Sequence, residues 1–102
     1  MAGRLEGKVA FITGVARGQG RSHAVRLAQE GADIIGVDLC DQMDSVAYAQ
    51  GSAEDLIETV KMVEALGRRI VALKGDVRER DQMRAAVNEG IAELGHLDIV
   101  VC

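Results

Sequence analysis

Three glycines, Gly14, Gly18 and Gly20, follow a short apolar segment at a spacing that suits the binding of a phosphate group. Glycine has no Cβ, so the backbone can turn tightly there and approach a ligand closely. A helical pattern begins near Gly18, and the first turn of a helix presents unpartnered N–H groups and the positive end of its dipole. We predict that the backbone N–H groups of Gly14, Gly18, Gln19 and Gly20 face a phosphate-bearing ligand.

An aspartate at the end of the next apolar segment extends this interpretation. The apolar run 34–37 is closed by Asp38, at about the 20-residue distance from the glycines that dinucleotide sites show. The dinucleotide-binding arrangement consists of these features in order, namely a strand, a glycine turn, a helix, a second strand and an acidic residue at its end. The carboxylate in that arrangement accepts hydrogen bonds from the hydroxyls of the adenosine ribose. The alternatives are a tight turn without a ligand and a solvated aspartate at a strand end.

The elements that must position these residues alternate between strand and helix. Strand-like apolar runs and intervening helical patterns follow one another at 9–13, 18–30, 33–38, 52–67, 70–74, 83–94 and 97–101. This alternation requires right-handed crossovers and a parallel sheet. We predict one dinucleotide-binding α/β domain over residues 1–102, a Rossmann-type parallel sheet with helices on both faces. The polar stretch 41–52 exceeds the usual connection of about 2–6 residues, which predicts an insertion over the site.

Composition excludes several other classes of protein. Hydrophobic residues make up 48% and charged residues 27% of the 102 residues, as in ordinary globular domains. A net charge of -4 and only two aromatic residues disfavour nucleic acid as a partner. Cys40 and Cys102 form neither a disulfide framework nor a metal-ligand cluster. Apolar segments are too short for a membrane span and no signal-peptide pattern is present, so we expect a cytoplasmic domain without metal or membrane contact.

The details of the motif resemble one family. G-x-G-x-x-G is not met, because His23 stands three residues after Gly20, but T-G-x-x-x-G-x-G is met from Thr13. That spacing resembles the short-chain dehydrogenase/reductase family. Further similarity to its mycofactocin-associated, carveol-dehydrogenase-like branch lies in the segments 18–24, 37–41 and 74–78. The resemblance covers the whole chain and identifies it as the N-terminal cofactor-binding half of such an enzyme.

The family pattern implies the strand order 3-2-1-4, with the sheet cut off after its fourth strand. The first two helices would then lie on one face and the third helix alone on the other. One helix cannot cover a four-stranded sheet, and residues 99–101 would form an open apolar edge. We therefore expect the chain to be part of a larger protein and, expressed alone, to aggregate or bind a hydrophobic dye.

The charges near the site favour NAD(H) over NADP(H). Arg17, just before the second glycine, resembles the NADP-preferring members of the family. A 2′-phosphate about 4 Å from the Asp38 carboxylate would meet about 4 kcal/mol of repulsion per unit charge at an effective dielectric constant of about 20. An exposed arginine offsets only about 0–1 kcal/mol of this repulsion, and Leu39 supplies no positive charge. We predict NAD as the cofactor, with Arg17 beside it.

The resemblance also implies an adenine pocket. Asp76 and Val77 follow the third strand, where the carboxylate would accept from the adenine amino group and Val77 would supply an apolar wall and a backbone N–H. Leu39 would line the same pocket. Taken from the residues alone, Asp76 is equally a turn or helix-capping residue.

No catalytic residue is predicted within the chain. The family uses Tyr-x-x-x-Lys with a serine, and the lysine lowers the pKa of the tyrosine from about 10 toward working pH. Tyr48 is the only tyrosine, and the residue four positions later is Ser52 rather than lysine. The cofactor half of the machinery is present and the reacting half is missing.

We interpret the chain as the NAD(H)-binding portion of a short-chain oxidoreductase that transfers hydride between nicotinamide and a secondary alcohol or ketone. We expect a homo-oligomer at full length, and the mycofactocin resemblance implies a retained NAD that a separate redox carrier reoxidises. One alternative is a non-catalytic dinucleotide-binding module. A second is an S-adenosylmethionine methyltransferase, disfavoured because Thr13 stands where an acidic residue is expected. A P-loop is excluded by spacing, since Val15 replaces its first glycine.

Overall fold

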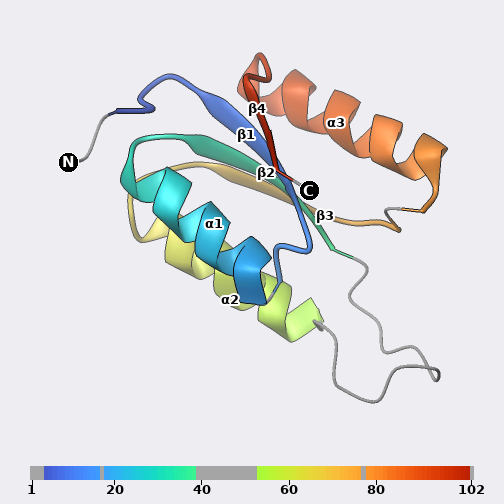
Figure 1. Cartoon of the computed structure of the whole chain (residues 1–102), viewed down its shortest axis with the longest axis horizontal. Coiled ribbons are helices and arrows are strands. Elements are labelled where there is room, and N and C mark those ends of the chain that lie inside the picture. Colours follow the sequence, from blue (N-terminus) through green and yellow to red (C-terminus); the bar gives the residue numbers. More distant parts are fainter. Residues whose placement is uncertain (1–3, 17, 39–52, 77, 102) are drawn as a thin grey trace.

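Four parallel strands form the sheet that positions the rest of the chain, in the order β3-β2-β1-β4 (Figure 1). The computed structural model describes residues 4–16, 18–38, 53–76 and 78–101. Its elements are β1 Val9–Thr13, α1 Gly18–Gln29, β2 Asp33–Asp38, α2 Ala53–Glu64, β3 Ile70–Lys74, α3 Arg80–Leu94 and β4 Ile99–Val101. The predicted α/β class and the strand order 3-2-1-4 are confirmed.

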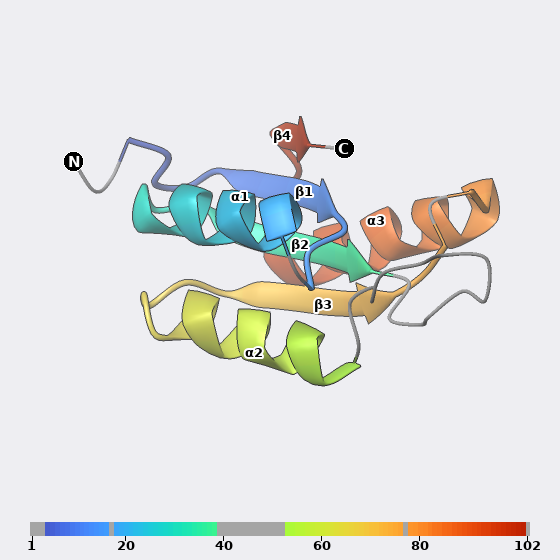
Figure 2. The same ribbon diagram turned by 60° about the horizontal axis from the view of Figure 1, so that its bottom comes forward.

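The helices cover the two faces of the sheet unequally. Helices α1 and α2 lie side by side on one face and α3 lies on the other (Figures 1 and 2). Alternate residues of β1 point into two separate cores, with Ala10 and Ile12 under α1 and α2, and Val9 and Phe11 under α3. Burial on both faces explains why the central strands are nearly continuous apolar runs.

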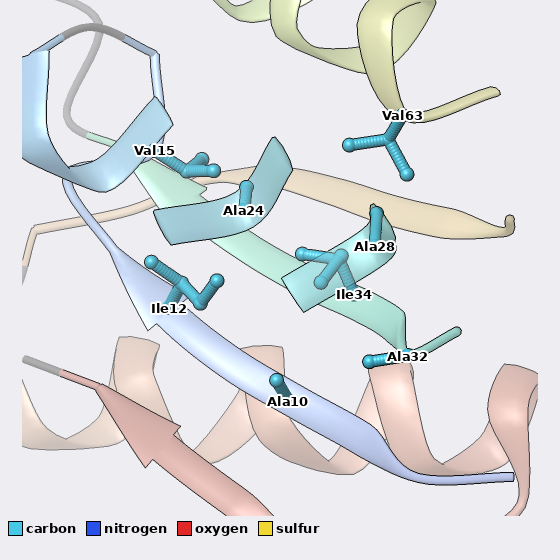
Figure 3. Packing of buried hydrophobic residues seen from close by; sticks show 8 residues of the cluster. All are labelled: Ala10, Ile12, Val15, Ala24, Ala28, Ala32, Ile34 and Val63. Atoms are coloured by element: carbon cyan, nitrogen blue, oxygen red, sulfur yellow. The ribbon is translucent and has the colours of Figure 1, made fainter. Parts of the chain in front are cut away.

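The core under α1 and α2 brings the start of α1 close to the sheet. Figure 3 shows its buried residues, which are Ala10, Ile12, Val15, Ala24, Ala28, Ala32, Ile34 and Val63. Alanines on the inner face of α1 allow a close approach of helix and strand. At Gly36 on β2, an added Cβ would lie 2.8 Å from a methyl carbon of Val15, so the residue after Gly14 packs directly on the neighbouring strand.

Several element boundaries differ from the prediction. Helix α1 ends at Gln29 rather than 30, and α2 runs from Ala53 to Glu64 rather than from 52 to 67. Helix α3 begins at Arg80, before the predicted 83. The prediction placed its start too late because the first turn of the helix is polar and carries no apolar periodicity. Strand β4 begins at Ile99 rather than 97. Leu97 packs instead against the core under α3, and Asp98 is held by the start of β1, where its carboxylate accepts from the Val9 N–H at 2.9 Å. The predicted insertion at 41–52 lies outside the described residues.

The far edge of β4 is open within the described part of the chain. Strand β4 pairs with β1 alone, and Val100 is 60% exposed. An exposed apolar strand edge is a site of pairing with further chain or with other molecules. Among the described helices, α1, α2 and α3 all lack the length and apolar character that crossing a bilayer demands.

Candidate functional site

The turn between β1 and α1 depends on its glycines for two different reasons. Gly14 (φ +67°) and Gly18 (φ +59°) adopt left-handed conformations that other residues rarely adopt. A Cβ built on either would meet no atom within 4 Å, so open space lies in front of both residues. Gly20 lies against the turn instead, and a Cβ there would overlap the carbonyl group of Gly14. The start of α1 can therefore approach β1 only because residue 20 is glycine.

Hydrogen bonds to acceptors on β2 fix the same turn on its inner side. The Gly14 N–H donates to the Val37 carbonyl oxygen at 2.8 Å, and the buried Ala16 N–H donates to Asp38 Oδ2 at 3.0 Å. This differs from the expectation that the Gly14 N–H faces a phosphate, because that N–H is already used by the end of β2. Gly14 contributes open space at the turn, and the N–H groups that α1 leaves unpartnered belong to its first turn from Gly18 onward.

The carboxylate of Asp38 lies beside the glycine turn and is buried, with 9% of the residue exposed. The end of β3 reaches the same place, since the Gly75 N–H donates to the Asp38 carbonyl oxygen at 2.9 Å. The ends of β1, β2 and β3 thus meet at one edge of the sheet. Ligands of open α/β sheets bind at this carboxyl edge of the strands.

Asp76 follows β3 at that edge and forms an ion pair with Arg78. Its Oδ2 lies 2.7 Å from Arg78 Nη2, and its Oδ1 accepts from the Arg78 backbone N–H at 2.9 Å. The side-chain hydrogen bond from Arg78 lowers the pKa of Asp76 to about 2. A lowered pKa stabilises the folded state above the ordinary value of 3.8, and that stabilisation is lost as the pH falls toward 2. Asp76 is thus an ionised hydrogen-bond acceptor at neutral pH.

Two residues of the site were not identified from the sequence. The hydroxyl of Thr59, on α2, lies 2.9 Å from the Val15 carbonyl oxygen in the glycine turn, and Arg21 Nε donates to that hydroxyl oxygen at 2.8 Å. Thr59 is fully buried. The helical spacing of α2 could have indicated it, because Thr59 falls between Leu56 and Val63 on the buried face.

The predicted site residues fall into two groups. Gly14, Gly18, Gln19, Gly20, Asp38 and Asp76 all lie at the carboxyl edge of the sheet or in the turn beside it. Arg17, Leu39 and Val77 lie outside the described residues, as do Tyr48 and Ser52.

The parallel sheet in the order β3-β2-β1-β4, with helices on both faces, defines a Rossmann-type domain. The family model described as short chain dehydrogenase matches residues 8–102, and the chain belongs to this family. The resemblance drawn from the glycine spacing is thereby confirmed.

Relatives of known name and structure agree with this assignment. (-)-trans-Carveol dehydrogenase of Rhodococcus erythropolis is 50% identical over 97 residues, 95% of this chain and 35% of that protein. The structure of carveol dehydrogenase from Mycobacterium avium in complex with NAD is 55% identical with a TM-score of 0.96, over 99% of this chain and 36% of that one. A short chain dehydrogenase from Mycobacterium paratuberculosis bound to NAD is 58% identical with a TM-score of 0.95, over 98% and 37%. The chain thus spans about a third of the length of these relatives.

Proposed function

We propose that this chain is the NAD(H)-binding part of a short-chain oxidoreductase that transfers hydride between nicotinamide and a secondary alcohol or ketone. The observation that carries the proposal is the junction of the glycine turn with Asp38. The Ala16 N–H holds the Asp38 carboxylate at 3.0 Å, beside a turn whose two left-handed glycines face open space. Donors for a diphosphate and an acceptor for a ribose therefore lie next to each other, which is what a dinucleotide requires.

Each part of the cofactor has candidate partners in this arrangement. The N–H groups of Gly18, Gln19 and Gly20, in the first turn of α1, would donate to the diphosphate, and the positive end of the helix dipole adds to the attraction. Asp38 would accept from the ribose hydroxyls through its carboxylate. Asp76, ionised and held in place by Arg78, would accept from the adenine amino group. When bound, NAD would supply the hydride acceptor, and these residues would hold and orient it.

Three further residues predicted from the sequence would also contact the cofactor. Arg17 would lie beside the diphosphate, while Leu39 and Val77 would line the adenosine pocket. We further propose that the full-length protein is a homo-oligomer and that a separate redox carrier reoxidises NAD that stays bound. The named dehydrogenases among the relatives support the enzyme over a non-catalytic dinucleotide-binding module, and family membership leaves the methyltransferase alternative without support.

The preference for NAD(H) is testable by titration. We expect the full-length protein to bind NADH at least about 100-fold more tightly than NADPH, because the buried Asp38 carboxylate would repel the 2′-phosphate by up to about 4 kcal/mol. Nicotinamide fluorescence gives both dissociation constants. A lower dissociation constant for NADPH would contradict the proposed cofactor, and no binding of either would contradict the function. With alcohol present, a single burst of NADH without turnover would support a retained cofactor.

A further inference from the structure

The hydroxyl of Thr59 lies on the buried face of α2. Thr59 and Val63 are fully buried on the same face of α2, one helical turn apart. A buried hydroxyl stabilises a fold only when it is hydrogen-bonded. Here it can donate to the carbonyl oxygens of Val15 at 2.9 Å and of Ala16 at 3.2 Å, both of which belong to the glycine turn.

Arg21 determines the direction in which that hydroxyl donates. A guanidinium group can only donate hydrogen bonds, so the 2.8 Å contact with Arg21 Nε makes Thr59 Oγ1 the acceptor. The single hydrogen of the Thr59 hydroxyl must then point at a carbonyl oxygen. Besides those of Val15 and Ala16, the Asp55 carbonyl oxygen on its own helix lies 3.2 Å away, and that of Val15 is the nearest of the three. Arg21 Nη2 also donates to the Asp55 carbonyl oxygen at 2.7 Å, which ties the first turn of α1 to the first turn of α2.

The turn is consequently held from both sides. On one side, its N–H groups donate to Val37 and Asp38 at the end of β2. On the other side, the Val15 carbonyl oxygen is the nearest acceptor for the Thr59 hydroxyl of α2, at 2.9 Å. The peptide groups of residues 14–16 lie just before α1, which begins at Gly18, so their orientation influences the direction of the N–H groups at the start of that helix.

We propose that Thr59, on α2, and Arg21, on α1, are positioning residues, whose side chains set the orientation of the diphosphate-binding N–H groups without touching the cofactor. This inference rests on the proposed NAD(H)-binding function. Preorganised donors bind an anion more tightly than donors that must be ordered on binding. The two residues therefore act on cofactor affinity more strongly than on the reaction of the bound cofactor.

The test is the substitution Thr59→Val in the full-length protein, which replaces the hydroxyl by a methyl group of similar size. We expect the dissociation constant of NADH, measured by fluorescence titration, to rise about 10-fold. The KM for NADH should rise with it, while kcat at saturating NADH stays within about twofold. Thr59→Ser keeps the hydroxyl and should restore affinity close to that of the wild type.

Val63→Ala is the matched control, because it loosens the same face of α2 without removing a hydrogen bond to the turn. It should lower the melting temperature and leave the NADH dissociation constant unchanged. Arg21→Met provides a second variant if Thr59→Val fails to fold, and its effect should also be about 10-fold. The double variant with Thr59→Val should bind NADH little more weakly than either single variant, since both changes break the same hydrogen-bond network.

Three outcomes separate the two proposals. Wild-type affinity for NADH in both Thr59→Val and Arg21→Met would overturn the positioning role and leave the cofactor assignment standing. Equal losses of affinity in Val63→Ala and Thr59→Val would overturn it too, because any loosening of α2 would then suffice. Failure of the wild-type protein to bind NADH would overturn the proposed function itself, and the positioning role with it.

Discussion

Replacing Gly20 by alanine should raise the dissociation constant of NADH at least about 100-fold in the full-length protein. The new Cβ would overlap the carbonyl group of Gly14 and lie 3.0 Å from the Thr13 carbonyl oxygen. Both neighbours are backbone atoms and cannot rotate away, so the start of α1 must move from the turn. Losing two hydrogen bonds to a charged diphosphate removes about 3 kcal/mol or more, which corresponds to about 100-fold in affinity. Fluorescence titration with NADH measures the change.

Gly90→Ala is the appropriate control for Gly20→Ala. Gly90 lies on α3, and an alanine Cβ there would lie 2.5 Å from Ile35 Cδ1 in the core of the opposite face. Overpacking of this kind destabilises a fold by about 1–3 kcal/mol, so the melting temperature should fall while NADH affinity is retained. If Gly20→Ala binds NADH as tightly as Gly90→Ala does, the first turn of α1 does not hold the diphosphate.

The second large effect is expected for Asp38→Asn, which should reverse much of the preference for NAD(H). The amide oxygen of asparagine can still accept from the Ala16 N–H, so the turn keeps its tie to β2. The negative charge is lost, and with it up to about 4 kcal/mol of repulsion toward a 2′-phosphate. We expect the ratio of the NADPH and NADH dissociation constants to fall on the order of 100-fold. Parallel titrations with the two cofactors give this ratio.

Asp33→Asn makes the same substitution at the opposite end of β2. Asp33 pairs with Arg69 at 2.8 Å on the amino edge of the sheet, where Arg69 is 64% exposed. That variant should leave the cofactor ratio unchanged, since it alters the net charge equally but lies far from the carboxyl edge. An unchanged ratio in Asp38→Asn, or an equal change in both variants, would show that Asp38 does not select the cofactor.

The fold could be predicted from the sequence because its signals are local. The segments 9–12 and 34–37 contain no polar side chain, as strands covered on both faces require. Glycines 31 and 67 follow the ends of α1 and α2 in left-handed conformations, as is common just after a helix. Strand order followed from the family pattern rather than from any of these local features.

The parts of the site that could not be predicted depend on contacts between distant residues. Thr59 and Val15 are separated by 44 positions. Helical spacing could place Thr59 on the buried face of α2, but it does not indicate that this residue meets the glycine turn. The use of the Gly14 N–H by Val37 was missed for the same reason. The pairing of Asp76 with Arg78 is local, but it depends on side-chain conformations that spacing does not determine.

A crystal structure of the full-length protein with NAD tests the central claim most directly. The account requires the diphosphate oxygens to lie about 3 Å from the backbone N–H groups of Gly18 to Gly20, and the adenosine ribose hydroxyls to donate to the Asp38 carboxylate. A diphosphate bound elsewhere, or an adenosine ribose without contact to Asp38, would contradict it.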